Sequence, residues 1–249
     1  MALNEIAKRV NKNVYRDGQY CYKAFSADYP TSDILNEALN QSRVYENGLF
    51  VPRVYEVKKI DDGRLAIVMD YIDGKSLAQL IDEYPENKNK YIDRLIEVQM
   101  SVHEFHADNL NKQRDKFNRK INISGLDATT RYELHARLDS MHKRNKLCHG
   151  DFNPSNVIIT SDDRACIIDW SHVTVGNASA DIARTYLLFK LAGDDETAEY
   201  YLKAYCKRSD TAMQYIQNWL PIVAASQMAK GKPDEKEFLM KWAEVCQYE

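Results

Sequence analysis

Two short segments carry the residues whose types and spacing could do chemistry. Residues 149–156 read His-Gly-Asp-Phe-Asn-Pro-Ser-Asn, and residues 167–170 read Ile-Ile-Asp-Trp. Together they supply an acid (Asp151), an amide (Asn156) and a second acid (Asp169). Magnesium prefers oxygen ligands and usually takes only one or two of them from protein, leaving the rest to water and phosphates. The pattern indicates phosphoryl transfer from a magnesium-bound nucleotide to a hydroxyl.

The chain between these segments predicts a β-hairpin. Residues 157–160 and 165–168 are two apolar runs separated by the polar sequence Ser-Asp-Asp-Arg, which is typical of a turn. With the turn centred between the two aspartates, Asn156 lies opposite Asp169. Side chains opposite each other have Cβ atoms roughly 4.5–5.5 Å apart. The amide and the carboxylate could therefore share one magnesium ion at the open end of the hairpin.

Simpler roles exist for some of these residues. His149 and Asn153 could merely cap turns around the loop. Asp169 is different, because it follows the apolar run Ala-Cys-Ile-Ile and precedes Trp170. Ionised carboxylates are rarely buried in apolar surroundings without a partner. A metal ion would be such a partner, which favours a functional role for Asp169.

The two segments resemble the catalytic loop and metal-binding acid of the aminoglycoside phosphotransferase and choline kinase family, small-molecule relatives of protein kinases. The loop of that family reads H-G-D-x-x-x-x-N, and its acid lies in an I-D-W or I-D-F segment. The resemblance implies that Asp151 is the catalytic base and that Asn156 and Asp169 bind Mg²⁺. It also implies that Asp181, in Ala-Ser-Ala-Asp-Ile-Ala-Arg, is the buried acid that steadies the loop.

A lysine and a glutamate in the first part of the chain could hold nucleotide phosphates. Residues 13–16 and 19–25 flank Asp-Gly, a strong hairpin signal, and Lys23 falls in the middle of the second strand. A helix is predicted from about residue 32 to 47. Lys23 alone could be an edge lysine that discourages aggregation. Paired with Glu37 on the helix, it resembles the family's device for holding the α- and β-phosphates.

That helix is predicted from a periodic stripe of small and apolar residues. Leu35, Ala38, Leu39 and Ser42 recur at helical spacing, and Gly48 is a stop signal. Glu37 lies at the flank of this stripe.

The nucleotide base is expected at a linker between two lobes. Residues 65–77 run from an apolar strand into a turn and a helix start. By resemblance only, the backbone of Met69, Asp70, Tyr71 and Ile72 would bond the base of ATP or GTP. The family often has a glycine-rich turn over the phosphates, whereas residues 9–13 here contain no glycine. Lys12 or the asparagine side chains would contact phosphate instead, or the lid would be loose.

The implied fold is α+β and protein-kinase-like, with two lobes. A small β-rich lobe with one helix is expected over residues 1–72, and a larger, mostly helical lobe carrying the catalytic hairpin over residues 73–249. Helices are predicted at 88–107, 179–192, 195–207, 210–230 and 234–247, with Pro221 kinking the fourth. Thr130 and Glu133 have capping-box spacing, which predicts a helix start at Thr130.

Composition excludes several other classes of protein. With 249 residues, 44% apolar and 29% charged, the chain is long enough to bury a sizeable core. A net charge of −3 gives no electrostatic footprint for nucleic acid or a membrane surface. The start of the chain lacks the apolar region of a signal peptide, so we expect a cytoplasmic protein. The five cysteines form no C-x-x-C pair and are expected to be reduced thiols.

The sequence gives the least information about the acceptor. From His149 onward, 15 acidic residues stand against 10 basic ones, which would suit a cationic acceptor such as an aminoglycoside or choline. Three of these acids already belong to the predicted site, however. The expected function is transfer of a γ-phosphate to a small-molecule hydroxyl. Two alternatives stay open: a catalytically idle nucleotide-binding regulatory module, and a protein kinase.

Overall fold

The structure, a computed structural model, describes residues 4–9 and 11–243. The chain separates into two compact units. The first contains Met1–Glu83 and Pro154–His172, and the second contains Tyr84–Asn153 and Val173–Glu249. The predicted catalytic hairpin thus packs with the N-terminal residues. The lobe boundary predicted after residue 72 stays a prediction, because a division by packing and a division by role need not coincide.

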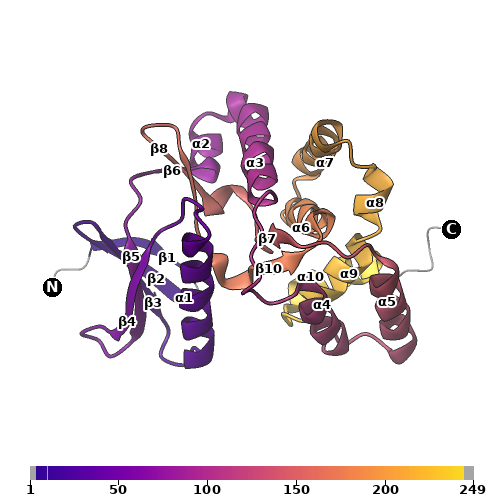
Figure 1. Ribbon diagram of the computed structural model, residues 1–249, viewed down its shortest axis with the longest axis horizontal. Coiled ribbons are helices and arrows are strands. Elements are labelled where there is room, and N and C mark those ends of the chain that lie inside the picture. Colours follow the sequence, from indigo (N-terminus) through magenta and orange to yellow (C-terminus); the bar gives the residue numbers. More distant parts are fainter. Residues whose placement is uncertain (1–3, 10, 244–249) are drawn as a thin grey trace. The chain divides into compact units, whose positions relative to one another are not determined.

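The first unit is built on an antiparallel sheet. Its strands are β1 (Asn4–Lys8), β2 (Lys12–Asp17), β3 (Tyr20–Phe25), β4 (Val54–Lys59) and β5 (Leu65–Asp70), in the order β1-β2-β3-β5-β4 (Figure 1). The predicted hairpin is present as β2 and β3, but its turn lies one residue later than expected. Asp17 pairs with Tyr20, so Gly18 and Gln19 make the turn. Gly18 takes a φ of 58°, which glycine adopts at little cost.

Helix α1 (Thr31–Glu46) covers one face of this sheet. Ile34 and Ala38 of the helix pack with Phe25 of β3 and with Ile67 and Met69 of β5. Ile67 and Met69 are two residues apart, and side chains at that spacing share one face of a strand. Burying each of the larger side chains contributes about 2 kcal/mol.

The helix predicted from about residue 32 to 47 is present as α1, but only part of its apolar stripe is buried. Leu35 and Leu39 are 52% and 48% exposed. The buried face instead contains the polar residues Glu37, Asn40 and Gln41. Gln41 can be buried because its side-chain amide donates to the carbonyl of Pro52 at 2.8 Å. Glu37 is likewise paired, with Lys12 and Lys23, so two of these three buried polar side chains have partners.

A smaller sheet completes the first unit. Strand β6 (Gly74–Ser76) pairs with β8 (Val157–Thr160), which pairs with β9 (Ala165–Ile167). Helix α2 (Leu77–Glu83) contacts β6 and β8. Short 3₁₀ turns, Pro154–Asn156 before β8 and Trp170–His172 after β9, flank the hairpin.

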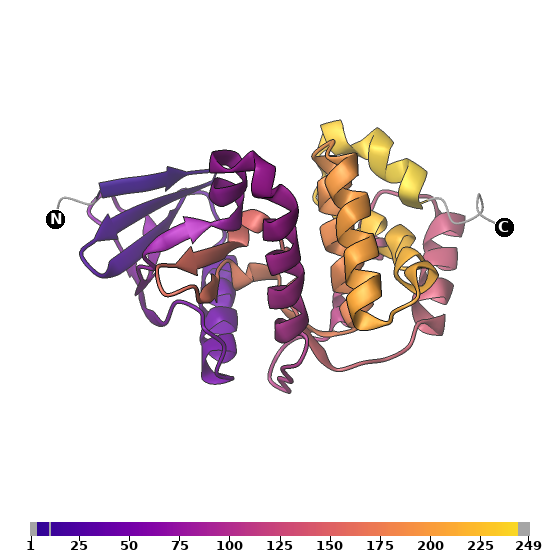
Figure 2. The ribbon, with the colours of Figure 1, turned by 90° about the horizontal axis from the view of Figure 1, so that it is seen from above.

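The second unit is mostly helical. Helix α6 packs against α7, which runs beside it, and also against α8 and α9 (Figure 2). Helix α9 also contacts α4, α5 and α10, and the strands β7 and β10 pair antiparallel. A 3₁₀ turn at Pro85–Asn87 precedes α3. The bounds are α3 (Lys88–Val102), α4 (Gln113–Asn122), α5 (Ala128–Ser140), β7 (Lys146–Cys148), β10 (Thr174–Gly176), α6 (Ala178–Leu191), α7 (Asp195–Ser209), α8 (Met213–Gln217), α9 (Leu220–Met228) and α10 (Pro233–Ala243).

Two predicted helix ends need correction. Helix α3 ends at Val102 and not near residue 107, because the chain turns so that the Phe105 carbonyl accepts from the Leu147 backbone at 3.1 Å. The start of α5 is capped by Asp127, whose carboxylate accepts from the Thr130 N–H at 3.0 Å. Asp127 is therefore the N-cap in place of Thr130, and the predicted capping box does not form.

The predicted helix at residues 210–230 is two helices. Helix α8 ends at Gln217 and α9 begins at Leu220, with Pro221 in its first turn. Proline is favoured there because its missing N–H would lack a helical partner anyway. The predicted helix at 234–247 is present as α10, and its last four residues lie outside the described part of the chain. No described helix is long and apolar enough to cross a membrane.

Candidate active site

The loop that carries Asp151 belongs to the second unit and is organised by Asp181. Strand β7 leads into the loop, and Gly150 turns it with a φ of 79°. The Asp181 carboxylate, near the start of α6, accepts from the backbone N–H of Gly150 at 2.7 Å and of His149 at 3.2 Å. This carboxylate therefore fixes the backbone that precedes Asp151.

Asp181 is held in turn by helix α3 and the turn after it. Its buried carboxylate lies 3.2 Å from the Gln99 side-chain amide and 3.1 Å from His103 Nε2. Burial alone would raise the pKa of Asp181, but the bond and charge of His103 and the donors on the loop outweigh it and lower the pKa. Asp181 is thus stabilised as a carboxylate, in agreement with the role that the resemblance implies.

We expect Asp181→Asn to lower the free energy of unfolding by about 3 kcal/mol, because it leaves buried donors without their acceptor. Since the folded-state pKa of Asp181 is lowered, its contribution is present above the ordinary aspartate value of about 3.9 and is lost as the pH falls through the folded-state pKa. Urea unfolding at several pH values should show a smaller acid dependence in the variant. Asp139→Asn, at an exposed ion pair, is the control and should match the wild type; an equal effect in both would contradict the role.

His149 and Asn153 have the simpler role that the sequence left open. The Nδ1 atom of His149 accepts from the Asp151 backbone N–H at 3.2 Å, and the Asn153 side chain donates to the Asp151 carbonyl at 2.9 Å. Both residues shape the turn around Asp151.

Arg184 is a member of the site that sequence reasoning missed. Its guanidinium lies 3.3 Å from Asp151 Oδ1 and donates to Gln227 Oε1 at 2.6 Å. Arg184 follows Asp181 by three residues, so the two side chains lie on neighbouring positions of one helix face. An arginine among the apolar residues of α6 was the available signal, since charged groups are rarely buried unless paired.

The predicted register of the hairpin was wrong by one residue. Val157 pairs with Ile167, and the Ile168 N–H donates to the Asn156 carbonyl at 2.9 Å, so Asn156 lies opposite Ile168 and not opposite Asp169. The cause is a three-residue turn that ends in Asp163 at a φ of 59°, a common alternative to two-residue turns.

Asp169 leaves the strand direction immediately after this pair. Its φ is 65°, a left-handed conformation that few residues other than glycine adopt and that aspartate tolerates. In a regular strand, the Asp169 side chain would point to the face opposite that of Ile168. The left-handed conformation of Asp169 turns its carboxylate away from that direction. Such backbone outliers cluster at functional sites.

Lys23 connects β3, α1 and Asp169. It lies on the α1-facing side of β3, two residues before Phe25, and pairs with Glu37 and, at 3.1 Å, with Asp169 Oδ1. Burial alone would lower the pKa of Lys23, but the Asp169 and Glu37 carboxylates outweigh it and raise the pKa. Lys12 also contacts Glu37, at 3.1 Å. The predicted contact between Lys23 and Glu37 is therefore present, and Lys23 also contacts Asp169.

Asn156 and Asp169 have side-chain oxygens of the kind that magnesium prefers. Asn156 is 8% exposed, and the Asp169 side chain is 33% exposed and accepts from the Ser171 hydroxyl at 3.1 Å. Among the described residues, no group of three or more His, Cys, Asp and Glu side chains could hold a metal. A hard cation that takes one amide, one carboxylate and substrate oxygens fits this donor set.

The predicted base-binding segment is partly committed to the sheet. The N–H groups of Asp70 and Tyr71 donate to the carbonyls of Arg53 and Gln19, at 3.1 and 2.8 Å. These two N–H groups are therefore already used within the protein and are not available to a nucleotide base.

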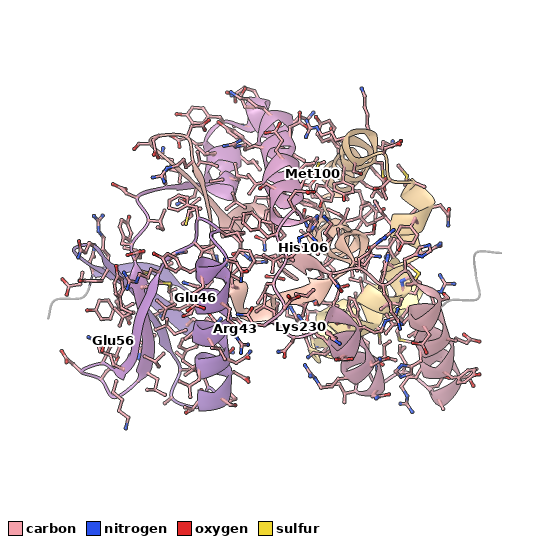
Figure 3. The ribbon with its side chains drawn as sticks, viewed as in Figure 1. Arg43, Glu46, Glu56, Met100, His106 and Lys230 are labelled. Carbon is pink, nitrogen blue, oxygen red and sulfur yellow. The ribbon has the colours of Figure 1, made fainter. Side chains whose placement is uncertain are left out.

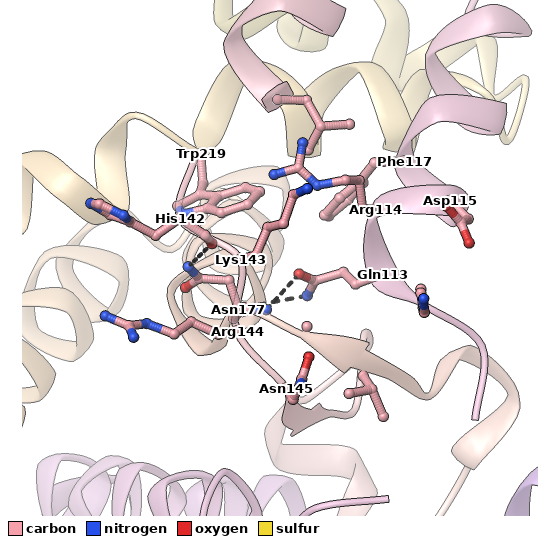
Figure 4. Close-up of a pocket in the computed structure, with 14 residues that line it drawn as sticks. Gln113, Arg114, Asp115, Phe117, His142, Lys143, Arg144, Asn145, Asn177 and Trp219 are labelled. Atoms are coloured by element: carbon pink, nitrogen blue, oxygen red, sulfur yellow. Dashed lines mark hydrogen bonds between the residues drawn. The ribbon is translucent and has the colours of Figure 1, made fainter. Parts of the chain in front are cut away.

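The second unit also contains a pocket of about 320 Å³ that includes none of the predicted site residues. Figure 4 shows Gln113 and Asn177 joined by hydrogen bonds beside Trp219, with the basic side chains Arg114 and Lys143 nearby. Sequence reasoning did not predict this pocket, because its residues come from separate segments.

Comparison with known proteins places this geometry in context. Similar folds include a thermostable mutant of aminoglycoside phosphotransferase APH(4)-Ia in a ternary complex with AMP-PNP and hygromycin B (15% identity, TM-score 0.69, 97% of this chain and 90% of that one). Aminoglycoside-3'-phosphotransferase of type VIII is similar as well (18% identity, TM-score 0.64, 92% of each chain). So is the choline kinase LicA from Streptococcus pneumoniae (14% identity, TM-score 0.66, 98% and 92%).

The α+β, kinase-like fold expected from the sequence is confirmed by these likenesses. None of the curated proteins compared with the chain matches it. The model of the phosphotransferase enzyme family matches residues 5–217. The chain therefore belongs to the phosphotransferase enzyme family.

Proposed function

We propose that this protein transfers the γ-phosphate of ATP or GTP to a hydroxyl of a small molecule in a magnesium-dependent reaction. The observation that carries the proposal is Lys23, which contacts both Glu37 and Asp169 within the first unit. A cation held between a helix carboxylate and the expected metal ligand is placed to bind nucleotide phosphates beside the metal.

The proposed roles of the first unit concern the nucleotide. Lys23, steadied by Glu37, orients the α- and β-phosphates, and the backbone of residues 69–72 holds the base. Asn156 and Asp169 hold the magnesium ion. When bound, the ion neutralises charge on the phosphate oxygens, which lowers the barrier to a loose, highly charged transition state.

The proposed role of Asp151 is that of the base. Its carboxylate accepts a hydrogen bond from the acceptor hydroxyl and takes the proton as the oxygen–phosphorus bond forms. Because Asp181 fixes the loop, the Asp151 carboxylate is already in position before the reaction begins. Positioning of this kind supplies much of the rate in phosphoryl transfer.

The two alternatives are less well supported. A protein kinase needs a long activation loop after its metal-binding acid, whereas here β10 follows the 3₁₀ turn at Trp170–His172 and α6 starts at Ala178. An idle module has no physical need of the Lys23–Glu37–Asp169 contacts. The neighbours that bind hygromycin B or are choline kinases support a small-molecule acceptor, with a cationic one among the candidates.

An ATP-consumption screen tests the proposal. The purified chain with MgATP would be offered aminoglycosides, choline-like amines, sugars, nucleosides, hydroxy acids and a protein panel, with GTP in parallel. We expect acceptor-dependent ATP consumption in a small-molecule class and its loss without magnesium. Labelling of the protein panel alone would favour a protein kinase. Nucleotide binding without acceptor-dependent consumption or slow hydrolysis would favour the idle module.

A further inference from the structure

The backbone is held on both sides of the proposed base, Asp151. On one side, the carboxylate of Asp181 in α6 accepts from the N–H of Gly150 at 2.7 Å. On the other side, the hydroxyl of Thr185, about one turn further along α6, donates to the carbonyl of Phe152 at 2.8 Å. Helix α6 therefore fixes the two residues between which Asp151 lies.

A buried glutamine of α3 joins these two contacts. Gln99 directly precedes Met100, which Figure 3 labels, and its side chain is fully buried. The side-chain amide of Gln99 donates to Asp181 Oδ2 at 3.2 Å and to the Thr185 hydroxyl at 3.3 Å. One side chain thus contacts both of the groups that hold the loop.

The chemistry of its partners fixes the orientation of the Gln99 amide. An ionised carboxylate can only accept hydrogen bonds, so the NH₂ group of Gln99 must face Asp181. The Thr185 hydroxyl lies closer to the Phe152 carbonyl, at 2.8 Å, than to the Asp181 carbonyl, at 3.3 Å, and while it donates there it can accept from Gln99. The buried oxygen of the Gln99 amide then needs a donor of its own.

Tyr201 of α7 supplies that donor. Its hydroxyl donates to Gln99 Oε1, and its side chain is fully buried. Burial raises the pKa of Tyr201 well above the ordinary tyrosine value, so the hydroxyl keeps its proton. A flipped Gln99 amide would place its oxygen against the Asp181 carboxylate. The loop network, as we call it, consists of Tyr201, Gln99, Asp181 and Thr185.

A simpler explanation is that these bonds only hold the helices together. Tyr200, the neighbouring residue of α7, makes a bond of that kind. Its hydroxyl donates to Asp93 of α3 at 3.0 Å, and the same carboxylate pairs with Arg208 of α7 at 3.0 Å. Both tyrosines connect α7 to α3, but the bonds of Tyr201 continue through Gln99 to the loop, whereas those of Tyr200 return to α7.

We propose that Gln99, oriented by Tyr201, is a positioning residue that keeps the Asp151 carboxylate ready to take the proton of the acceptor hydroxyl. The inference rests on the proposed function and adds two residues that act through Asp181 and Thr185. Small displacements of a reacting group slow the chemical step sharply. Loss of the loop network should therefore lower kcat and spare the proposed nucleotide contacts, which lie in the first unit.

Tyr201→Phe tests this inference with a small change, since it removes the hydroxyl and keeps the ring. With an acceptor identified by the screen, kcat should fall about 10-fold, the order that one buried hydrogen bond contributes, and the KM for MgATP should stay within about twofold. Tyr200→Phe removes the hydroxyl of the neighbouring residue and is the matched control. Its kcat and KM should equal those of the wild type.

Thr185 allows a rescue experiment. Thr185→Val keeps the shape of the side chain and loses the hydroxyl, so kcat should again fall about 10-fold. Thr185→Ser restores the hydroxyl, and most of the lost kcat should return. If Thr185→Ser were as slow as Thr185→Val, the packing of the methyl group would account for the loss, and the proposed path through Thr185 would be wrong.

Amide hydrogen exchange separates this inference from the proposed function, because it needs no acceptor. The N–H of Gly150 should exchange faster in Tyr201→Phe than in the wild type or in Tyr200→Phe, since its bond to Asp181 opens more often. That result without turnover of any acceptor in the full screen would defeat the proposed function but not the role of Gln99 in fixing the loop.

Four results would overturn the inference. They are equal kcat in Tyr201→Phe and the wild type, equal losses in Tyr201→Phe and Tyr200→Phe, a change only in the KM for MgATP, and equal exchange of the Gly150 N–H in all three proteins.

Discussion

Asp151→Asn is expected to lower kcat by about 10³-fold, the contribution typical of a positioned general base. Asparagine preserves the size of the side chain and can still contact Arg184, but it cannot take the proton of the acceptor hydroxyl. Nucleotide binding should survive, because the residues proposed to bind phosphates lie in the other unit. Steady-state turnover with an acceptor identified by the screen and calorimetry with AMP-PNP and magnesium would measure the two effects.

A second aspartate provides the control for this substitution. Asp163→Asn changes the same atoms in the turn between β8 and β9, where the φ of 59° is one that asparagine also tolerates. Its turnover should equal that of the wild type. Undiminished turnover in Asp151→Asn would remove Asp151 as the base, and loss of nucleotide affinity in that variant would mean that the substitution disturbs more than proton transfer.

The parts of the site that the sequence predicted are those set by local spacing. The loop at 149–156 and the acid at Asp169 are separated by a short hairpin, so few chain paths connect them. Even there, the predicted register of the hairpin was wrong by one residue. Ser-Asp-Asp-Arg is compatible with both a two-residue and a three-residue turn, and the sequence alone does not distinguish them. The positive φ of Asp169 is also invisible in the sequence, although it redirects the carboxylate.

The Lys23–Glu37 pair shows how chemistry compensates for an ambiguous pattern. The apolar stripe chosen for α1 included Leu35 and Leu39, which are exposed, yet Glu37 was correctly paired. A buried cation in the middle of a strand needs a nearby acid. This requirement identified Glu37 as the partner even though the buried face of the helix was not identified correctly. Charge pairing thus located the contact better than hydrophobic periodicity did.

The contact between Arg184 and Asp151 could not be predicted from the sequence. The two residues are 33 positions apart along the chain, and only the fold brings their side chains together. A charge count over the C-terminal region weights every carboxylate equally, whether or not it is paired. The local field at a site depends on which charges are near it and on which are already paired.

Asp169→Asn is expected to abolish most of the magnesium dependence of nucleotide binding. In the presence of magnesium, the affinity for AMP-PNP should fall by about 100-fold, because loss of a residue that only supports a metal ligand already costs up to about this factor in metal affinity. Asparagine tolerates the φ of 65°, so the loss reports the charge and not the backbone, whereas Asp169→Ala would combine both effects. The substitution also removes one of the two carboxylates that contact Lys23.

Calorimetry with and without magnesium would separate these effects. In the wild type, the metal should strengthen AMP-PNP binding, and in Asp169→Asn the affinities with and without metal should converge. Ser171→Ala is the matched control, because it removes the hydroxyl that donates to Asp169 Oδ1 and leaves the carboxylate in place. That variant should keep most of the metal effect. If Asp169→Asn bound the nucleotide as tightly as the wild type and gained as much from magnesium, Asp169 would not be a metal ligand, and the Lys23 contact would serve the phosphates alone.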